Sequence, residues 1–230
     1  MARKKREFYI VDQDKHLIVV DKPAGLLAVP IPGSKAKNLY ELVARHLGKH
    51  GVKVWTVHRI DRYTSGLMVF AKRHKTYKQL VEQFKEHAPE RTYLALVRGK
   101  LEQDEGELVH YLKLIKDGFK NVVVNKSQKD ATFARLTFKV KERFKGATLV
   151  EIQLDTGLKN QIRVQFNEIG HPLVGDQHYA PEEKREKLIN RQALHAYKLK
   201  FYHPAKHSEV SYKAKIPGDM RRLIKRYRRK

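Results

Sequence analysis

The strand-like segments of this chain follow one another in runs instead of alternating with helices. Four of them occur in succession: LVHYLKLI (108–115), FKNVVV (119–124), ATFARLTFKV (131–140) and ATLVEIQL (147–154). Polar and apolar residues alternate clearly in the last two, as expected for strands with one buried face. Because successive strands with short connections pair antiparallel, the pattern predicts an α+β fold with a largely antiparallel sheet.

The remaining segments predict further strands and a small number of helices. Apolar residues at helical spacing predict a helix over 38–51, where Asn38 and Glu41 fit a capping box. Further helices are expected over 76–87, 160–170 and 181–192. Further strands are expected over 8–11, 17–20, 52–57, 67–72, 92–99, 193–204 and 208–216. We expect a single domain over residues 1–217, followed by a basic helix or tail at 218–230.

The net charge indicates a polyanionic partner. The chain has 49 Lys and Arg against 25 Asp and Glu, which gives a formal charge of +24 over 230 residues. Because neutralised phosphates supply most of the affinity in nucleic-acid binding, nucleic acid is the first candidate. The chain shows no apolar segment long enough to span a membrane and no signal peptide, so we expect a cytoplasmic protein without a membrane partner. A monomer is the default expectation.

The residue types also restrict the chemistry. The absence of cysteine excludes disulfides, thiolate metal sites and a thiol nucleophile. The twelve histidines are scattered and form no His-Glu-x-x-His pattern, and neither a GxGxxG nor a GxxxxGK[ST] loop is present. We therefore expect a reaction that uses neither a metal ion nor a cofactor.

The segment HRIDRYTSGL (58–67) places a single acid between two arginines. Asp61 lies between Arg59 and Arg62, in a predicted loop that connects two strands. One interpretation is a surface ion pair of little energetic value. The other is a fixed carboxylate that acts as a nucleophile, or that stabilises cationic character at the anomeric carbon of a sugar. In so basic a protein, the second interpretation suggests a nucleotide within a nucleic acid.

Other residues allow two interpretations each. Arg163 is either a solvated helix residue or the partner that orients a buried carboxylate. Tyr93, in a predicted strand, is either a core residue or an aromatic group that stacks on a base or takes a proton. Lys159 precedes a predicted helix, where a phosphate can bind. The terminal RRLIKRYRRK is either a solvated tail or a segment that, with Tyr227, follows an RNA backbone.

Three separated stretches resemble conserved blocks of the RluA-type RNA pseudouridine synthases. They are DKPAGLLAVP (21–30), HRIDRYTSGLMVFAK (58–72) and TGLKNQIRVQFNEIGHPLVGDQHY (156–179). The intervening ERTYLALVRG and ALHAYKLKFYHP also match, so the resemblance extends over about residues 12–217 in the expected order. It implies a mixed domain around a bent, mainly antiparallel sheet with an RNA-binding cleft across it.

The resemblance also implies roles for individual residues. The catalytic aspartate of such enzymes corresponds to Asp61, the basic residue paired with it to Arg163, and the active-site tyrosine to Tyr93. Arg62 corresponds to the arginine that fills the gap left by the extruded nucleotide. The predicted RNA-binding residues are His58, Arg59, Arg62, Lys159 and Lys22. The implied reaction converts uridine in ribosomal or transfer RNA to pseudouridine without a cofactor.

The chain departs from the family pattern at three places. Leu158-Lys159-Asn160 replaces the usual Arg-Thr-His, Gln165 stands where histidine is common, and Tyr63 replaces a frequent aspartate. These differences and the high charge leave a second hypothesis open: a basic RNA-binding or ribosome-assembly protein that has the same fold but no turnover.

Overall fold

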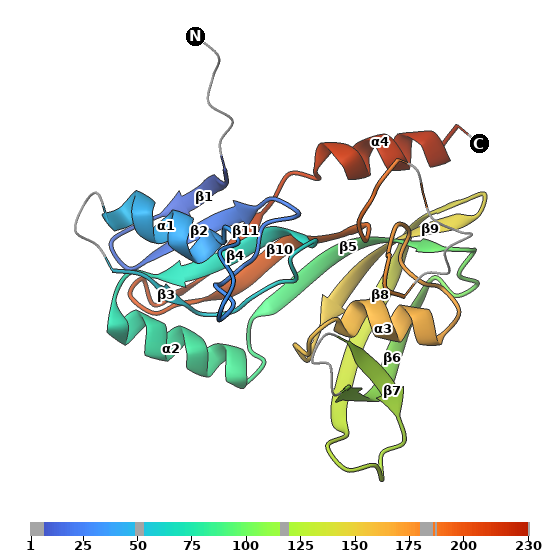
Figure 1. The fold of residues 1–230 in the computed structure, drawn as a ribbon, viewed down its shortest axis with the longest axis horizontal. Helices are drawn as coiled ribbons and strands as arrows, with labels where there is room; N and C mark the ends of the chain where they lie inside the picture. The colour runs from blue at the N-terminus through green and yellow to red at the C-terminus, as the bar shows by residue number, and fades with distance from the viewer. Residues whose placement is uncertain (1–6, 49–52, 116–119, 180–185, 187, 230) are drawn as a thin grey trace. The chain divides into compact units, whose positions relative to one another are not determined.

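The computed structural model describes residues 7–48, 53–115, 120–179, 186 and 188–229. Within these residues the chain forms two compact units, shown in Figure 1. The first unit takes its residues from 1–89 and 196–215, and the second from 90–195 and 216–230. Neither unit is continuous in sequence, because the last part of the chain contributes to both.

The first unit contains a sheet that carries the HRIDRYTSGL segment. Its strands are β1 (Tyr9–Gln13), β2 (Leu17–Lys22), β3 (Trp55–Thr56), β4 (Ser65–Ala71), β10 (Leu194–His203, in this unit from Ala196) and β11 (Ser208–Lys213). The order across the sheet is β1-β2-β4-β10-β11, and β3 also pairs with β4. In the antiparallel β2–β4 pair, Leu17 lies opposite Ala71 and Lys22 lies opposite Gly66.

Two helices accompany this sheet, α1 (Leu39–Gly48) and α2 (His74–Lys85), and Figure 1 shows them on either side of its strands. The predicted cap of α1 is present, since the Asn38 side chain accepts a hydrogen bond of 2.9 Å from the Glu41 amide. Leu80 of α2 packs on strand residues in a cluster that includes Leu17, Val19, Leu67, Val69, Leu199 and Phe201. The strands that bear the loop therefore have a continuous apolar base.

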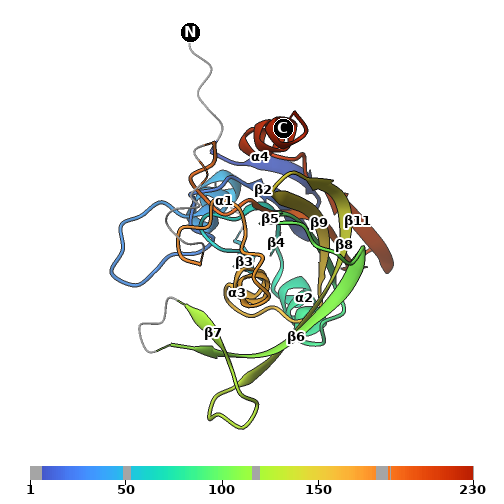
Figure 2. The ribbon, with the colours of Figure 1, turned by 90° about the vertical axis from the view of Figure 1, so that its right-hand side faces the viewer.

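The second unit contains the run of strands that the alternation predicts. They are β5 (Glu90–Arg98), β6 (Glu105–Leu114), β7 (Asn121–Val124), β8 (Thr132–Phe144) and β9 (Ala147–Leu154). Their order is β5-β9-β8-β6-β7, and every adjacent pair is antiparallel. Figure 2 shows β9, β8 and β6 curving around α3 (Gln161–Glu168). The α+β class is thus confirmed.

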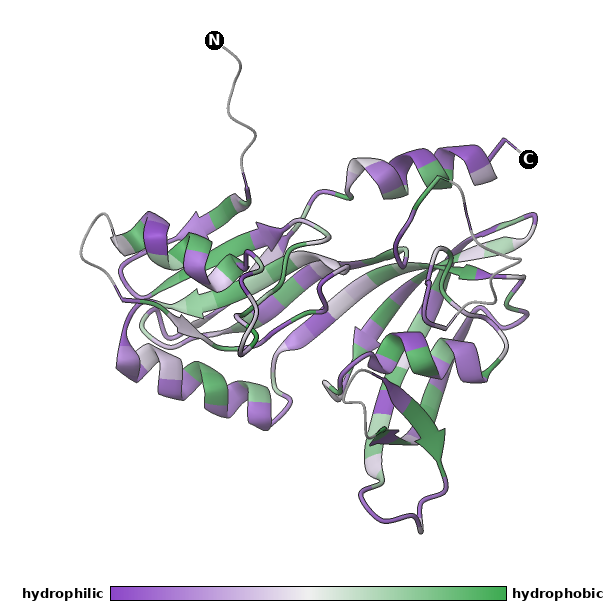
Figure 3. Ribbon diagram, viewed as in Figure 1, coloured by the Kyte–Doolittle hydropathy of each residue, from purple (hydrophilic) through white to green (hydrophobic). Residues whose placement is uncertain are grey.

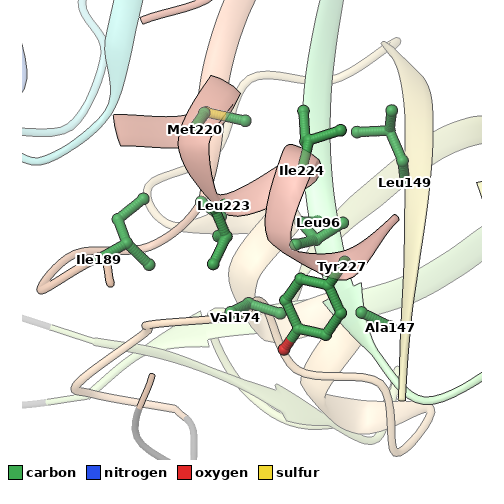
Figure 4. Packing of buried hydrophobic residues seen from close by; sticks show 10 residues of the cluster. Leu96, Ala147, Leu149, Val174, Ile189, Met220, Leu223, Ile224 and Tyr227 are labelled. Atoms are coloured by element: carbon green, nitrogen blue, oxygen red, sulfur yellow. The ribbon is translucent and has the colours of Figure 1, made fainter. Parts of the chain in front are cut away.

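Residues 218–227 of the predicted basic segment form helix α4 (Gly218–Tyr227), which packs on the second unit. Its apolar residues Met220, Leu223, Ile224 and Tyr227 contact Leu96, Ala147, Leu149, Val174 and Ile189, as Figure 4 shows. Figure 3 accordingly shows hydrophobic bands within a mostly hydrophilic helix. Tyr227 is buried, and its hydroxyl lies 3.3 Å from the Glu186 carboxylate. The Tyr227 ring therefore packs in the core of this unit, and RNA binding by the basic segment stays a prediction.

The predicted helix over 181–192 is wrong where the structure describes it. Residues 188–192 are irregular, whereas 181–185 and 187 lie outside the described residues. Tertiary contacts explain the difference, because Ile189 packs against α4 and the buried Arg191 makes two hydrogen bonds to Asp219 of that helix. The end of the predicted 38–51 helix also lies outside the described residues, at 49–51.

The described residues contain neither a candidate membrane span nor a candidate metal site. None of the helices there combines the length and apolarity needed to cross a membrane. Among the same residues, His, Asp and Glu side chains form no group of three or more arranged to hold a metal ion.

Candidate active site

Residues 57–64 form a loop between β3 and β4 in the first unit, as predicted. Asp61 lies in it and is half-buried, while Arg59 and Arg62 are exposed. The Thr64 amide donates a hydrogen bond of 3.1 Å to the Asp61 carbonyl, which closes a turn from Asp61 to Thr64. The carboxylate is thus carried by a short turn at the start of β4.

Lys22 anchors this loop through hydrogen bonds from its side chain. Its side chain is 0% exposed, and Nζ donates to the carbonyls of Pro23 (3.1 Å), Leu26 (2.7 Å) and Arg62 (2.9 Å). The amine therefore connects the DKPAGLLAVP segment to the residue that follows Asp61. The cation is buried and directed at backbone oxygens, which gives Lys22 an anchoring role, and its contact with RNA stays a prediction.

His58 holds the start of the loop. Its Nε2 accepts a hydrogen bond of 3.1 Å from the Val69 amide, and its ring stacks on Phe84 with centroids 4.5 Å apart. An imidazole that accepts a hydrogen bond at Nε2 carries its proton on Nδ1, so the ring is neutral in this arrangement. This geometry gives His58 an anchoring role, and a direct contact between His58 and RNA stays a prediction.

Gly66 fixes the exit of the loop into β4. It has a φ of +118°, and a Cβ at this position would collide with the backbone of Ala196 in β10. Only glycine combines this dihedral angle with so close an approach of two chains. The Thr64-Ser65-Gly66 sequence that follows the loop therefore sets how the loop joins the sheet.

Arg62 is oriented by its neighbours. Its Nε donates a hydrogen bond of 3.0 Å to the Gly25 carbonyl, and its guanidinium carbon lies 5.3 Å from the centre of the Tyr63 ring. The Gly25 amide in turn donates to the Arg62 carbonyl at 2.9 Å. Tyr63, where the family pattern often has an aspartate, thus supplies a surface on which the Arg62 guanidinium lies.

The second unit contains the other two predicted catalytic residues. Tyr93 lies in β5 opposite Ile152 of β9 and is 8% exposed. Arg163 lies on α3 and is 6% exposed, and Nε and Nη2 donate to the Asp176 carboxylate at 2.6 and 2.8 Å. Asp176 is fully buried and also accepts hydrogen bonds from the His178 and Tyr179 amides. Arg163 is therefore held rigidly.

The departures from the family pattern have structural roles at the start of α3. Asn160 has a left-handed φ of +57° before the helix, and Gln161 accepts a hydrogen bond of 3.0 Å from the Leu158 amide. Gln165 is 0% exposed and donates to the Leu108 carbonyl of β6 at 3.0 Å. Lys159 is exposed, but its carbonyl accepts from the Asn121 side chain. The substituted block thus ties α3 to neighbouring strands.

The sequence did not lead us to expect that Asp176 would be the buried partner of Arg163. The residue closes the GHPLVGD segment after Gly175, which has a φ of +76° and would clash with the Arg191 carbonyl if it carried a Cβ. An acid that follows such a glycine and an apolar run was a usable signal for a buried ion pair. Asp61 belongs to the first unit, whereas Tyr93 and Arg163 belong to the second, so their predicted meeting stays a prediction.

A family profile described as RNA pseudouridylate synthase matches residues 16–168, a range that includes Asp61, Tyr93 and Arg163. The chain belongs to this family. Its activity class is therefore that of an RNA pseudouridine synthase, which is an isomerase, and the recognition made from the sequence is confirmed.

Among curated relatives, the pseudouridine synthase YlyB of Bacillus subtilis, itself named as uncharacterized, is 37% identical over 97% of this chain and 73% of its own length. The dual-specificity RNA pseudouridine synthase RluA of Vibrio parahaemolyticus is 37% identical over 86% of this chain and 79% of its own length. The ribosomal large subunit pseudouridine synthase D of Nitrosomonas europaea is 34% identical over 95% of this chain and 65% of its own length.

A solved structure agrees at the level of the fold. Human RNA pseudouridylate synthase domain containing 4 matches with a TM-score of 0.79 and 24% identity, over 96% of this chain and 93% of that chain. The pseudouridine synthase fold is therefore established for this chain as well.

Proposed function

We propose that this synthase converts specific uridines of structured ribosomal or transfer RNA to pseudouridine, with Asp61 as the catalytic residue. The observation that carries the proposal is the fixed turn that presents the half-buried Asp61 carboxylate at the start of β4. A carboxylate that needed only an ion pair would not require the buried Lys22 amine and the His58 ring as anchors.

Asp61 acts at C1′ of the target nucleotide. The C1′–N1 bond breaks with its electron pair remaining on the uracil, and the carboxylate stabilises the positive character left on the sugar. The base turns, C5 forms a bond to C1′, C5 loses its proton and N1 gains one. No atoms enter or leave overall, which is consistent with a reaction that consumes no cofactor.

Arg163 and Tyr93 assist this step. In the proposal, Arg163 orients the Asp61 carboxylate, and its hydrogen bonds to Asp176 fix its own position. Tyr93 packs on the uracil and helps to remove the C5 proton. A rigid protein scaffold around these side chains lowers the entropic cost of holding the reacting groups in a productive geometry.

RNA is bound by exposed cations near these residues and across the surface. Arg62, with its guanidinium already turned over the Tyr63 ring, stacks where the target base leaves the helix. Arg59 and Lys159 contact phosphates. The charge of +24 provides the remaining, sequence-independent affinity.

The test is pseudouridine mapping of total RNA from cells that lack the gene, complemented with either the wild type or Asp61→Asn. A pseudouridine that is lost on deletion and restored only by the wild type names the substrate and supports the role of Asp61. Turnover by Asp61→Asn would overturn that assignment. If no site disappears on deletion while the purified protein binds RNA, the second hypothesis, an RNA-binding or assembly factor without turnover, replaces the first.

A further inference from the structure

The first unit contains a cavity of about 490 Å³ that the proposed mechanism does not use. It is lined by Lys15, His16, Arg73, Lys75, Thr76, Gln79, Pro204, Ala205 and His207. These residues come from three places: the turn before β2, the first two turns of α2 with the residue before it, and the turn between β10 and β11.

The cavity lies away from the candidate catalytic loop. Arg73 follows the last residue of β4, whereas Asp61 precedes its first residue, and β4 has seven residues. At about 3.3 Å per residue, the strand alone separates the two ends by about 20 Å. The β2–β4 pairing agrees, because Leu17 beside the cavity lies opposite Ala71, and Lys22 beside the loop lies opposite Gly66.

The N-terminus of α2 opens at this cavity without a cap. Arg73 occupies the cap position and provides no side-chain hydrogen bond, and the first turn contains no acidic residue. The first amide of this helix to reach a backbone carbonyl is that of Tyr77, which bonds Arg73 at 2.9 Å. The preceding amides and the helix dipole therefore favour an anion here.

Thr76 is a second, independent sign of a ligand. Its side chain lines the cavity, and the residue is only 3% exposed. Among the described residues, its hydroxyl forms no hydrogen bond, and it is not one of the buried polar atoms that lack a partner, so it remains accessible from the cavity. A hydroxyl that has no partner in the protein can donate a hydrogen bond to an acceptor placed in the cavity.

The cations around the cavity lack carboxylate partners. Within the described part of the chain, Lys15, Arg73 and Lys75 form no ion pair. The carboxylate of the nearby Asp14 has other partners, because it accepts from the His16 and Leu17 amides and lies 2.8 Å from the His203 ring and 3.7 Å from Lys206 Nζ. Three unpaired cations, a free hydroxyl and an uncapped helix together match the donor set of a phosphate.

We propose that this cavity binds a phosphate group of the RNA backbone, at a position distant from the uridine being modified. The identification of the anion as phosphate follows from the donors alone, whereas its assignment to RNA rests on the proposed function. Pro204 and Ala205 give the cavity an apolar wall, which suits the sugar attached to such a phosphate.

The first experiment titrates the full-length protein with inorganic phosphate and follows backbone amide resonances. We expect saturable shifts confined to His74, Lys75 and Thr76, and we expect Thr76→Val and the double variant Arg73→Gln/Lys75→Gln each to weaken binding at least fivefold. The matched control is Lys78→Gln, which removes one exposed, unpaired charge of the same helix outside the cavity. Shifts that do not saturate, or that Lys78→Gln weakens equally, would overturn the site.

The second experiment identifies the source of the phosphate with oligouridylate and UMP as probes. If RNA supplies it, oligouridylate shifts the same amides, and Arg73→Gln/Lys75→Gln lowers the slope of log affinity against log salt by about 1. A preference for UMP over oligouridylate would refute the RNA assignment. Asp61→Asn should retain this phosphate binding, so failure of the proposed catalytic function and failure of the phosphate site give different results.

Discussion

The guanidinium of Arg163 and the carboxylate of Asp176 form a buried, two-point hydrogen-bonded pair in the second unit, with N–O distances of 2.6 and 2.8 Å. Asp176 holds the arginine through backbone amides as well, so its position is set by the fold and not by a bound substrate. The proposed assistance to Asp61 would thus come from a side chain that does not have to be ordered when RNA arrives.

Replacing Asp176 with Asn should destabilise the protein and impair catalysis together. The substitution leaves the charge of Arg163 buried without its counterion, which costs about 3 kcal/mol. We expect a lower unfolding midpoint, and turnover more than tenfold below wild type at temperatures where the variant is folded. Glu105→Gln is the control, because it breaks an exposed pair with Lys139 in the same unit and should change stability by less than about 1 kcal/mol. Equal effects of the two would contradict the role of Asp176.

Lys22→Met should separate loop anchoring from RNA contact. Methionine fills a similar volume but leaves three partly buried carbonyls without their donor, which costs about 1 kcal/mol. We expect reduced turnover and stability, with the salt dependence of RNA binding unchanged. Lys35→Met, at an exposed position, serves as the control for stability. A shallower salt dependence in Lys22→Met would show instead that Lys22 does contact RNA.

Asp21→Asn should raise stability at neutral pH. Burial raises the pKa of Asp21 from its ordinary value of 3.8 to about 6, although the neighbouring charge of Lys22 lowers it. The unfolded chain therefore ionises first, and stability falls between about pH 4 and pH 6 as the pH rises. Above pH 6 we expect the substitution to raise the free energy of unfolding by about 1 kcal/mol, because solvent around the partly exposed side chain screens part of the effect.

The measurement for Asp21→Asn is denaturant unfolding at several pH values. The variant and the wild type should have equal stability below pH 4, where both states are protonated, and should diverge as the pH passes through the interval up to about 6. Asp130→Asn, in an exposed turn of the other unit, should not reproduce this divergence. A constant difference at every pH would rule out titration of Asp21 as the cause.

The exposed face of α4 should contribute to RNA binding. Arg221 and Lys225 lie on this face four residues apart, about 6 Å along the axis, Arg229 follows the end of the helix, and all three are exposed. Changing all three to Gln should weaken RNA binding at low salt at least tenfold and flatten its salt dependence, with turnover at saturating RNA unchanged. Arg228→Gln should have a smaller effect, because the Arg228 guanidinium is already bound to Glu142 at 2.7 Å. If the slope of log RNA affinity against log salt is unchanged in the triple variant, this face of α4 does not contact RNA.

The α+β class and most elements could be predicted from the sequence because they depend on local periodicity. In β8, for example, Ala134, Leu136 and Phe138 are buried, whereas Arg135 and Lys139 are exposed, as the alternation of ARLTFKV predicts. The loop that carries Asp61 was also predictable, because two apolar runs flank a polar segment that ends in glycine.

The remaining features depend on contacts between distant residues, which periodicity does not record. A lysine such as Lys22 is usually found at the surface. Its burial is favourable here because its amine donates to the carbonyls of Leu26 and Arg62. The charged segment over 181–192 has helical periodicity, yet the pairing of Arg191 with Asp219 and the packing of Ile189 override it in the residues described. A single sequence gives no sign of which long-range partner a charged residue will find.

The close approach of Gly66 to Ala196 has a consequence for how the enzyme forms during translation. The backbone on which the Asp61 loop rests comes from a segment about 130 residues later in the sequence, and α4 reaches the second unit later still. A nascent chain that has exposed the HRID residues therefore still lacks the strand against which they are seated. The loop that carries Asp61 should acquire its final geometry only after β10 has left the ribosome, so truncated translation products that contain Asp61 but end before β10 should be inactive.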